Sequence, residues 1–70
     1  MELKFAERLK ELRQDKGLSQ LALSKQIGVK HSTIIRWESG KMIPTITYVA
    51  KLALYFNVST DYLIGLKDYE

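Results

Sequence analysis

The sequence predicts an all-α fold built from five short helices. Apolar residues recur every three to four positions along most of the chain, which is the period of a helix that buries one face. Glycine, serine, threonine and asparagine interrupt this pattern at short intervals, where helices begin and end. No segment of four or more residues alternates strictly between apolar and polar side chains, so no strand is predicted.

The first two helices are delimited by glycine and serine. Gly17 suits the left-handed residue that ends a helix, and Ser19 is the natural N-cap of a second, shorter helix. Gly28 ends that second helix in the same way. The apolar positions that these two helices turn inward are Phe5, Leu9, Leu12, Leu23 and Ile27.

A third helix is expected from about Lys30 to Ser39, with Ile34 and Trp37 on its apolar face and Gly40 at its end. The segment that follows, 41–44, is predicted to be a loop. Proline biases the residue before it away from the helical region, so Pro44 prevents a helix from continuing through Ile43.

The fourth and fifth helices are predicted from their caps. Thr45 caps the fourth helix, and the segment 57–59 breaks it. Ser59 caps the last helix, which ends near Gly65. The inward positions of these two helices are Val49, Leu52, Ala53, Phe56 and Leu63.

Length and composition exclude several classes of protein. A chain of 70 residues has room for one hydrophobic core, and we expect one domain over 1–66 with a short tail over 67–70. With no cysteine and His31 as the single histidine, neither a disulfide framework nor a histidine or thiolate metal site is predicted, and no cofactor is expected. No apolar run approaches the roughly 20 residues that cross a bilayer, and the charged N-terminus is not a signal peptide. We therefore expect a cytoplasmic protein.

Positive charge is concentrated in the middle of the chain. The net charge is +3, and residues 16–41 carry five basic side chains against one acidic, a net of +4. Concentrated basic charge is typical of a protein that binds a polyanion, most often a nucleic acid. Net charge alone favours an ordinary solvated surface, so its meaning depends on where the fold places it.

Two short helices joined at Gly28 and Val29 match the outline of a helix-turn-helix, in which a brief turn joins helices at a steep angle. Glycine suits the turn because its backbone adopts positive φ without a Cβ clash. Val29 would fill the angle between the helices. Periodicity alone does not distinguish this unit from another helical hairpin.

Short motifs follow one another in a distinctive order along the chain. They are Leu18-Ser19-Gln20, Ile27-Gly28-Val29, Ser32-Thr33-Ile34, Arg36-Trp37-Glu38, Gly40-Lys41 and Pro44-Thr45, then Leu52-Ala53, Phe56, Val58-Ser59 and Asp61-Tyr62-Leu63. This ordered set, from about Phe5 to Gly65, resembles the Cro/cI-type helix-turn-helix repressors, also called lambda repressor-like or XRE-family regulators. The resemblance implies a five-helix DNA-binding domain with its helix-turn-helix at about 19–39. It also implies a transcriptional regulator, most often a repressor, that binds a palindromic double-stranded operator as a homodimer.

The resemblance assigns base contacts to the third helix, which corresponds to the recognition helix of the family. Lys30, His31, Ser32 and Arg36 match the family positions that face base edges in the major groove. Arg36 can pair bidentately with guanine, with a phosphate contact or a solvated side chain as the alternative. His31 can donate to a guanine or a phosphate, and Ser32 can serve either.

Phosphate contacts are assigned by the same resemblance to the helix ends. Gln20 matches a glutamine that reaches a phosphate at the start of the second helix, where backbone N–H groups also point. Ser19 lies beside it, either as a phosphate contact or as a cap alone. Ser39 and Lys41 lie where a second phosphate would pass.

Arg13 and Glu38 match an ion pair of the family that joins the first helix to the end of the recognition helix. We expect the partly buried form of this pair, with a looser surface pair as the alternative. Trp37 is expected to pack in the core against the fourth helix.

Four positions depart from the family pattern. Leu21 and Ala22 stand where polar residues are usual, and Lys30 replaces a hydroxyl residue that usually caps the recognition helix. Ile35 stands where small or polar residues are common, and it either contacts thymine methyl groups or packs as a half-buried residue.

The last helix offers the best candidates for a dimer contact, because Tyr62, Ile64 and Leu66 point away from the position that Leu63 occupies. The alternative is that they fold back on their own subunit. A second function remains open, a protein-interaction module on the same fold with Leu21 and Ile35 added to that surface. An antitoxin-type autoregulator would share this sequence pattern. No catalytic constellation, membrane partner or small-molecule site is predicted.

Overall fold

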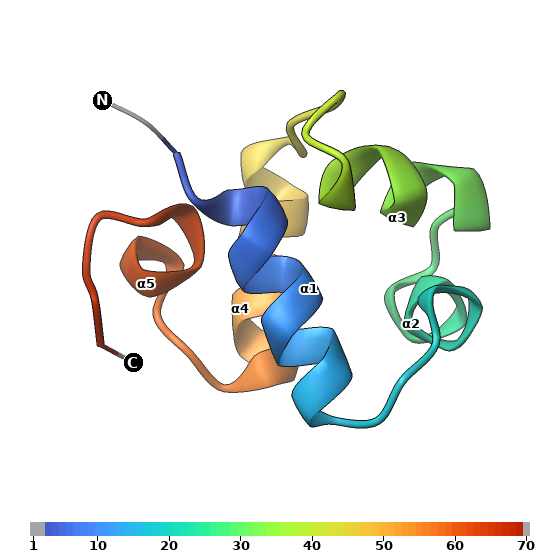
Figure 1. Ribbon diagram of the computed structural model, residues 1–70, viewed down its shortest axis with the longest axis horizontal. Coiled ribbons are helices and arrows are strands. Elements are labelled where there is room, and N and C mark those ends of the chain that lie inside the picture. The colour runs from blue at the N-terminus through green and yellow to red at the C-terminus, as the bar shows by residue number, and fades with distance from the viewer. Residues whose placement is uncertain (1–2, 70) are drawn as a thin grey trace.

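The computed structural model describes residues 3–69, and in this range it contains five α-helices and no strand (Figure 1). The all-α prediction is therefore confirmed. Met1, Glu2 and Glu70, which the sequence assigned to the domain and its tail, lie outside the described residues. The helices are α1 (Phe5–Asp15), α2 (Gln20–Ile27), α3 (His31–Glu38), α4 (Ile46–Phe56) and α5 (Thr60–Ile64).

The helix starts follow the predicted caps with one difference. The Ser19 hydroxyl accepts a hydrogen bond from the Ala22 amide at 2.9 Å, and Ser59 caps α5 in the same way at 3.0 Å. Thr45 occupies the predicted N-cap position of α4, but its side chain makes no capping hydrogen bond. Lys30 at the start of α3 also lacks a side-chain cap, as its side chain has no acceptor.

Left-handed residues end three of the helices. Gly28 ends α2 with φ of 85°, and its amide donates to the Ser24 carbonyl at 2.8 Å. Asn57 ends α4 with φ of 56°, and asparagine is one of the few residues that tolerate this region. Gly65 ends α5 with φ of 96°.

The hydrophobic core takes one fully buried aliphatic side chain from every helix. These five side chains have no exposed surface: Leu9, Leu23, Ile34, Leu52 and Leu63. Burying each contributes about 1.5–3 kcal/mol relative to leaving it in water. In Figure 1, α2 and α3 lie on one side of α1 and α5 lies on the other, so α1 joins the two ends of the molecule.

Trp37 is a core residue, as predicted, with 2% of its surface exposed. Its ring contacts Phe5 of α1 edge-on at 6.3 Å and Tyr48 of α4 at 5.7 Å between centroids. Edge-on and tilted aromatic pairs of this kind add about 0.5–1.5 kcal/mol beyond burial. Trp37 thereby fixes α3 against α1 and α4.

Two basic side chains make structural contacts that periodicity could not reveal. Arg8 is 8% exposed, and its guanidinium donates to the carbonyl oxygens of Tyr62 at 2.7 Å and Lys67 at 2.9 Å. Lys51 of α4 donates to the Ile27 carbonyl at 2.7 Å, at the negative end of the α2 dipole. Arg8 thus fastens α5 and the start of the tail to α1, while Lys51 fastens α2 to α4.

Candidate nucleic-acid interface

The helix-turn-helix predicted from the sequence is present in α2 and α3. Three residues, 28–30, separate the two helices, and the left-handed Gly28 makes the reversal possible. Figure 1 shows α2 nearly end-on while α3 runs across the view, so their axes cross steeply. Val29 is half-buried and packs against the core, which is the place predicted for it.

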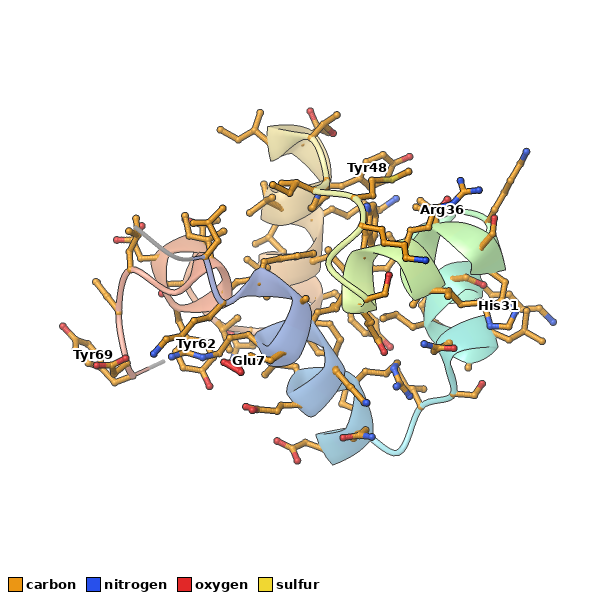
Figure 2. The ribbon with its side chains drawn as sticks, turned by 45° about the horizontal axis from the view of Figure 1, so that its top comes forward. Glu7, His31, Arg36, Tyr48, Tyr62 and Tyr69 are labelled. Atoms are coloured by element: carbon orange, nitrogen blue, oxygen red, sulfur yellow. The ribbon has the colours of Figure 1, made fainter. Side chains whose placement is uncertain are left out.

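One face of α3 is open to solvent, and the opposite face is buried. Ile34 and Trp37 point inward, with 0% and 2% of their surface exposed. The exposed residues of α3 and its flanks include all four predicted base contacts, and Figure 2 shows His31 and Arg36 far from Tyr62 and Tyr69. These exposed residues are Lys30, His31, Ser32, Ile35, Arg36 and Ser39.

The predicted phosphate contacts lie at the two ends of this unit. At the start of α2, Ser19 is engaged as a cap and Gln20 is half-buried, with its Nε2 donating to Glu38 Oε1 at 3.2 Å. An amide nitrogen carries two hydrogens, so the second remains to donate to an external oxygen. At the end of α3, Ser39 and Lys41 are exposed.

Arg13 and Glu38 form the buried version of the predicted ion pair. Arg13 Nε donates to Glu38 Oε2 at 2.6 Å and Nη2 donates to Oε1 at 2.9 Å. The third contact of the guanidinium is the Leu18 carbonyl at 2.7 Å. Only 10% of the Arg13 side chain and 4% of the Glu38 side chain are exposed. Because Gln20 also donates to Glu38, one carboxylate links α1, α2 and α3.

The environment of Arg13 stabilises its charged form. Its hydrogen bond to Glu38 raises the pKa of the guanidinium above its ordinary value, and the Coulombic attraction of the same carboxylate acts in the same direction. Burial opposes this shift without cancelling it. The charge of this residue is therefore fixed at every pH at which the domain would operate.

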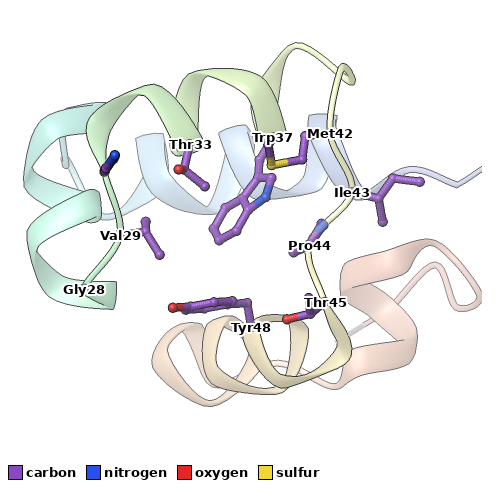
Figure 3. Close-up of a pocket in the computed structure, with 10 residues that line it drawn as sticks. Gly28, Val29, Thr33, Trp37, Met42, Ile43, Pro44, Thr45 and Tyr48 are labelled. Atoms are coloured by element: carbon purple, nitrogen blue, oxygen red, sulfur yellow. The ribbon is translucent and has the colours of Figure 1, made fainter.

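An apolar groove of about 520 Å³ runs beside α3, between this helix, the following loop and the start of α4. Figure 3 shows Trp37 and Tyr48 on its two long sides, with Val29 near one end and Pro44 near the other. The indole N–H of Trp37 is buried there without an acceptor in the part of the chain that the structure describes. Among the predicted base contacts, Lys30 alone borders this groove.

The predicted dimer contacts lie at the far end of the molecule from α3. Tyr62 is half-buried, packs against the core and has the Arg8 guanidinium 4.1 Å from its ring centre, so much of it folds back on its own subunit. Ile64 is half-buried, whereas Leu66 is 51% exposed. Two more apolar residues, Ile43 and Ile46, are 69% and 85% exposed, and no sequence pattern marks them as surface residues.

Within residues 3–69 no three potential metal-binding side chains of histidine, aspartate or glutamate lie together. None of the helices in this range has both the length and the apolar character needed to cross a membrane.

A family model described as helix-turn-helix matches residues 9–63 of the chain. Among curated proteins, the transcriptional activator BcrR of Enterococcus faecalis is 36% identical over 63 residues, which are 90% of this chain and 31% of that protein. An HTH-type transcriptional regulator of Archaeoglobus fulgidus is 35% identical over 63 residues, and there the match covers 90% of both chains. The chain therefore spans about a third of one relative and nearly all of the other.

Two solved structures share this arrangement of helices. A transcriptional regulator from Listeria innocua superimposes with a TM-score of 0.88 and 32% identity, over 93% of this chain and 61% of that one. The P22 c2 repressor, solved in complex with a synthetic operator, superimposes with a TM-score of 0.83 and 28% identity. That match covers 90% of this chain and 96% of the repressor.

Proposed function

The chain belongs to the helix-turn-helix family of Cro/cI type, and on that premise we propose that it represses transcription by binding a palindromic operator as a homodimer. In this proposal α3 lies in the major groove and α2 crosses the DNA backbone. Base contacts come from Lys30, His31, Ser32 and Arg36. The protein acts where the DNA is, in the cytoplasm of a bacterial-type cell, and the proposal assigns it no catalytic role.

The observation that carries the proposal is the exposed face of α3. Four side chains with hydrogen-bonding groups lie on or beside one face of α3. The opposite face packs in the core through Ile34 and Trp37, which are 0% and 2% exposed. A rigid helix with such a face matches the width of the major groove, where each base pair presents a distinct pattern of donors and acceptors. Arg36 supports the most specific contact, since its planar fork fits guanine O6 and N7.

Phosphate contacts at both ends of the unit would set the register of α3 on the duplex. At one end, Ser19 and Gln20 accompany the N-terminus of α2, whose first backbone N–H groups suit an anion. At the other end, Ser39 and Lys41 stand exposed beyond α3. The excess of positive charge in residues 16–41 falls on this same unit, which supports a polyanionic partner.

A two-fold dimer would place two copies of α3 in successive major grooves about 34 Å apart. We assign the contact between subunits to the α5 end, where Tyr62, Ile64 and Leu66 lie. Leu66 is the most accessible of the three and carries most of the expected contact. A surface this small would give a weak dimer that forms on the operator.

The test is an unbiased selection from random double-stranded DNA with the purified protein. We expect recovery of an inverted repeat whose half-sites are about one helical turn apart, and repression of a reporter that carries this repeat near its promoter. Arg36→Ala serves as the control, since it should lose the preference at one base pair of each half-site. Selection that enriches no sequence would overturn the proposal and favour the protein-interaction module, and increased reporter expression would identify an activator.

A further inference from the structure

We propose that Ile35 is a specificity-determining residue that reads the 5-methyl group of a thymine in the operator. The inference rests on the proposed function, because it requires α3 to lie in the major groove. It adds an apolar contact to a recognition face that is otherwise polar.

Ile35 lies in the middle of the exposed face of α3. Successive residues of a helix are about 100° apart, which places Ile35 at about 40° from His31 and about 60° from Ser32 around the axis. Arg36 lies about 100° away on the other side of Ser32. The preceding residue, Ile34, has no exposed surface, whereas 44% of Ile35 is exposed. The two isoleucines therefore point in different directions, and only Ile34 belongs to the core.

The fold gives no reason of its own for isoleucine at this position. Ile35 is absent both from the buried core and from the partly buried residues that pack against it. A β-branched side chain is also a poorer helix former than alanine, leucine or lysine, so local helix stability does not favour it. Its flanking positions on the same face are polar, with His31 one turn before it and Ser39 one turn after it.

The chemistry of the groove limits what an apolar side chain can read there. The major-groove edges of adenine, guanine and cytosine present hydrogen-bond donors and acceptors, and thymine alone adds a methyl group. Contact with that methyl removes apolar surface of both partners from water. Uracil lacks this group, and 5-methylcytosine carries it on a different base, so these two bases separate methyl reading from hydrogen bonding.

The position of the thymine relative to another base is also limited. Ile35 and Arg36 are consecutive, with a rise of about 1.5 Å along the helix, whereas base pairs are about 3.4 Å apart. The two side chains therefore reach the same base pair or neighbouring ones. We expect the thymine to lie within one base pair of the guanine that Arg36 contacts.

The experiment replaces each thymine of the selected operator by uracil, one at a time, and measures affinity by fluorescence anisotropy. We expect one position in each half-site to lose about three- to fourfold in affinity, which is the effect of burying one methyl group. Two further operators carry cytosine or 5-methylcytosine in place of that thymine. The methylated operator should bind more tightly than the unmethylated one by a similar factor. All other thymines should tolerate uracil.

Two variants test whether the loss of affinity on uracil substitution depends on the side chain of Ile35. Ile35→Ala should bind the thymine and uracil operators equally, and because alanine favours helix at this exposed site the variant should fold as the parent does. Arg36→Ala should bind both operators more weakly while keeping the same thymine-to-uracil ratio. Circular dichroism melts of both variants check their folding.

The outcomes separate this inference from the proposed function. An operator that is bound specifically but shows no uracil effect, or an effect that persists in Ile35→Ala, overturns the methyl contact while repression by DNA binding stands. Failure to recover any operator overturns the proposed function and the inference with it.

Discussion

Arg13 and Glu38, 25 positions apart in the chain, form an ion pair with two hydrogen bonds that joins α1 to α3. Their side chains are 10% and 4% exposed, so neither charge can be hydrated in place of its partner. Gln20, a predicted phosphate contact, donates to the same carboxylate. The orientation of α3 and the position of the Gln20 amide therefore depend on one pair.

Removing one partner of this pair should be strongly destabilising. Arg13→Ala and Glu38→Ala each leave a buried charge without its partner, and we expect a loss of about 3–5 kcal/mol in the free energy of unfolding. The double variant Arg13→Met with Glu38→Leu should lose less than either single change, because no charge is left buried. Urea unfolding followed by circular dichroism measures all three.

An exposed ion pair provides the matched control. Lys4 and Asp68 approach to 3.7 Å with side chains that are 46% and 86% exposed. Asp68 also lies 3.5 Å from the guanidinium of Arg8, so the exposed pair is removed on its own by Lys4→Gln, which should cost less than about 1 kcal/mol. Equal losses at the buried and the exposed pair would contradict the role assigned to Arg13 and Glu38.

The contribution of Arg13 to stability should not vary around neutral pH. A group whose pKa is raised by folding stabilises the native state fully below its unfolded pKa, and the contribution is lost only as the pH rises through the folded value. The pKa of Arg13 is raised above the ordinary arginine value, so the loss would begin only in strongly alkaline solution. Urea midpoints of the parent and of Arg13→Lys, measured from neutral to mildly basic pH, should therefore keep a constant difference.

Affinity for DNA should fall steeply with salt. If each subunit neutralises about 3–5 phosphates, the logarithm of the association constant should decrease with the logarithm of salt concentration by about 0.9 per phosphate. Lys41→Ala should reduce the slope by about one contact, whereas Lys67→Ala, at the far end of the chain, should leave it unchanged. Anisotropy titrations over a range of salt test this, and a flat response would favour protein interaction over DNA binding.

Arg36→Ala and Gln20→Ala should weaken binding in different ways. The arginine change should cost about 1–3 kcal/mol on the best operator and relax preference at one base pair. The glutamine change should weaken good and poor sequences alike, because a phosphate contact carries no base information. Binding to a panel of single-base operator variants distinguishes the two, and uniform losses for both would remove Arg36 from base readout.

Leu66→Glu should reduce cooperative occupancy of the full palindrome while leaving binding to a half-site nearly intact. A charge on a subunit contact opposes association without altering the α3 face. Leu54→Glu is the matched control, since Leu54 is 82% exposed on α4 and stands outside the proposed contact. Should Leu54→Glu or Ile46→Glu abolish cooperativity instead, the dimer forms through α4.

Most of the fold could be predicted because its signals are local. Gly28 and the two serine caps act within four residues, and the apolar period located every fully buried aliphatic side chain. Thr45 takes the predicted N-cap position of α4 without a side-chain hydrogen bond, because a hydroxyl residue there does not have to turn its side chain toward the helix. Sequence position alone does not determine that rotamer.

The candidate site was harder to complete from sequence, since its supporting contacts are long-range. Resemblance supplied Arg13 and Glu38, and the structure confirmed them as a buried pair. Neither the burial of Arg8 nor the bond from Lys51 to Ile27 has a periodic signature, because each joins helices more than 20 positions apart. For Ile35, the departure from the family pattern left a thymine contact and half-buried packing open, and the structure shows it 44% exposed and outside the residues that pack against the core.

The contacts of Arg8 have a consequence for the order in which the chain folds. Its hydrogen bonds reach carbonyl groups 54 and 59 positions further along the chain. During synthesis α2 and α3 can pair soon after they leave the ribosome, since their contacts are local. Arg8, by contrast, stays hydrated by water until Tyr62 and Lys67 have emerged. A nascent chain that pauses before this point lacks the contacts of α5 with α1 and α4, so we expect the domain to gain its full stability only after Lys67 has emerged.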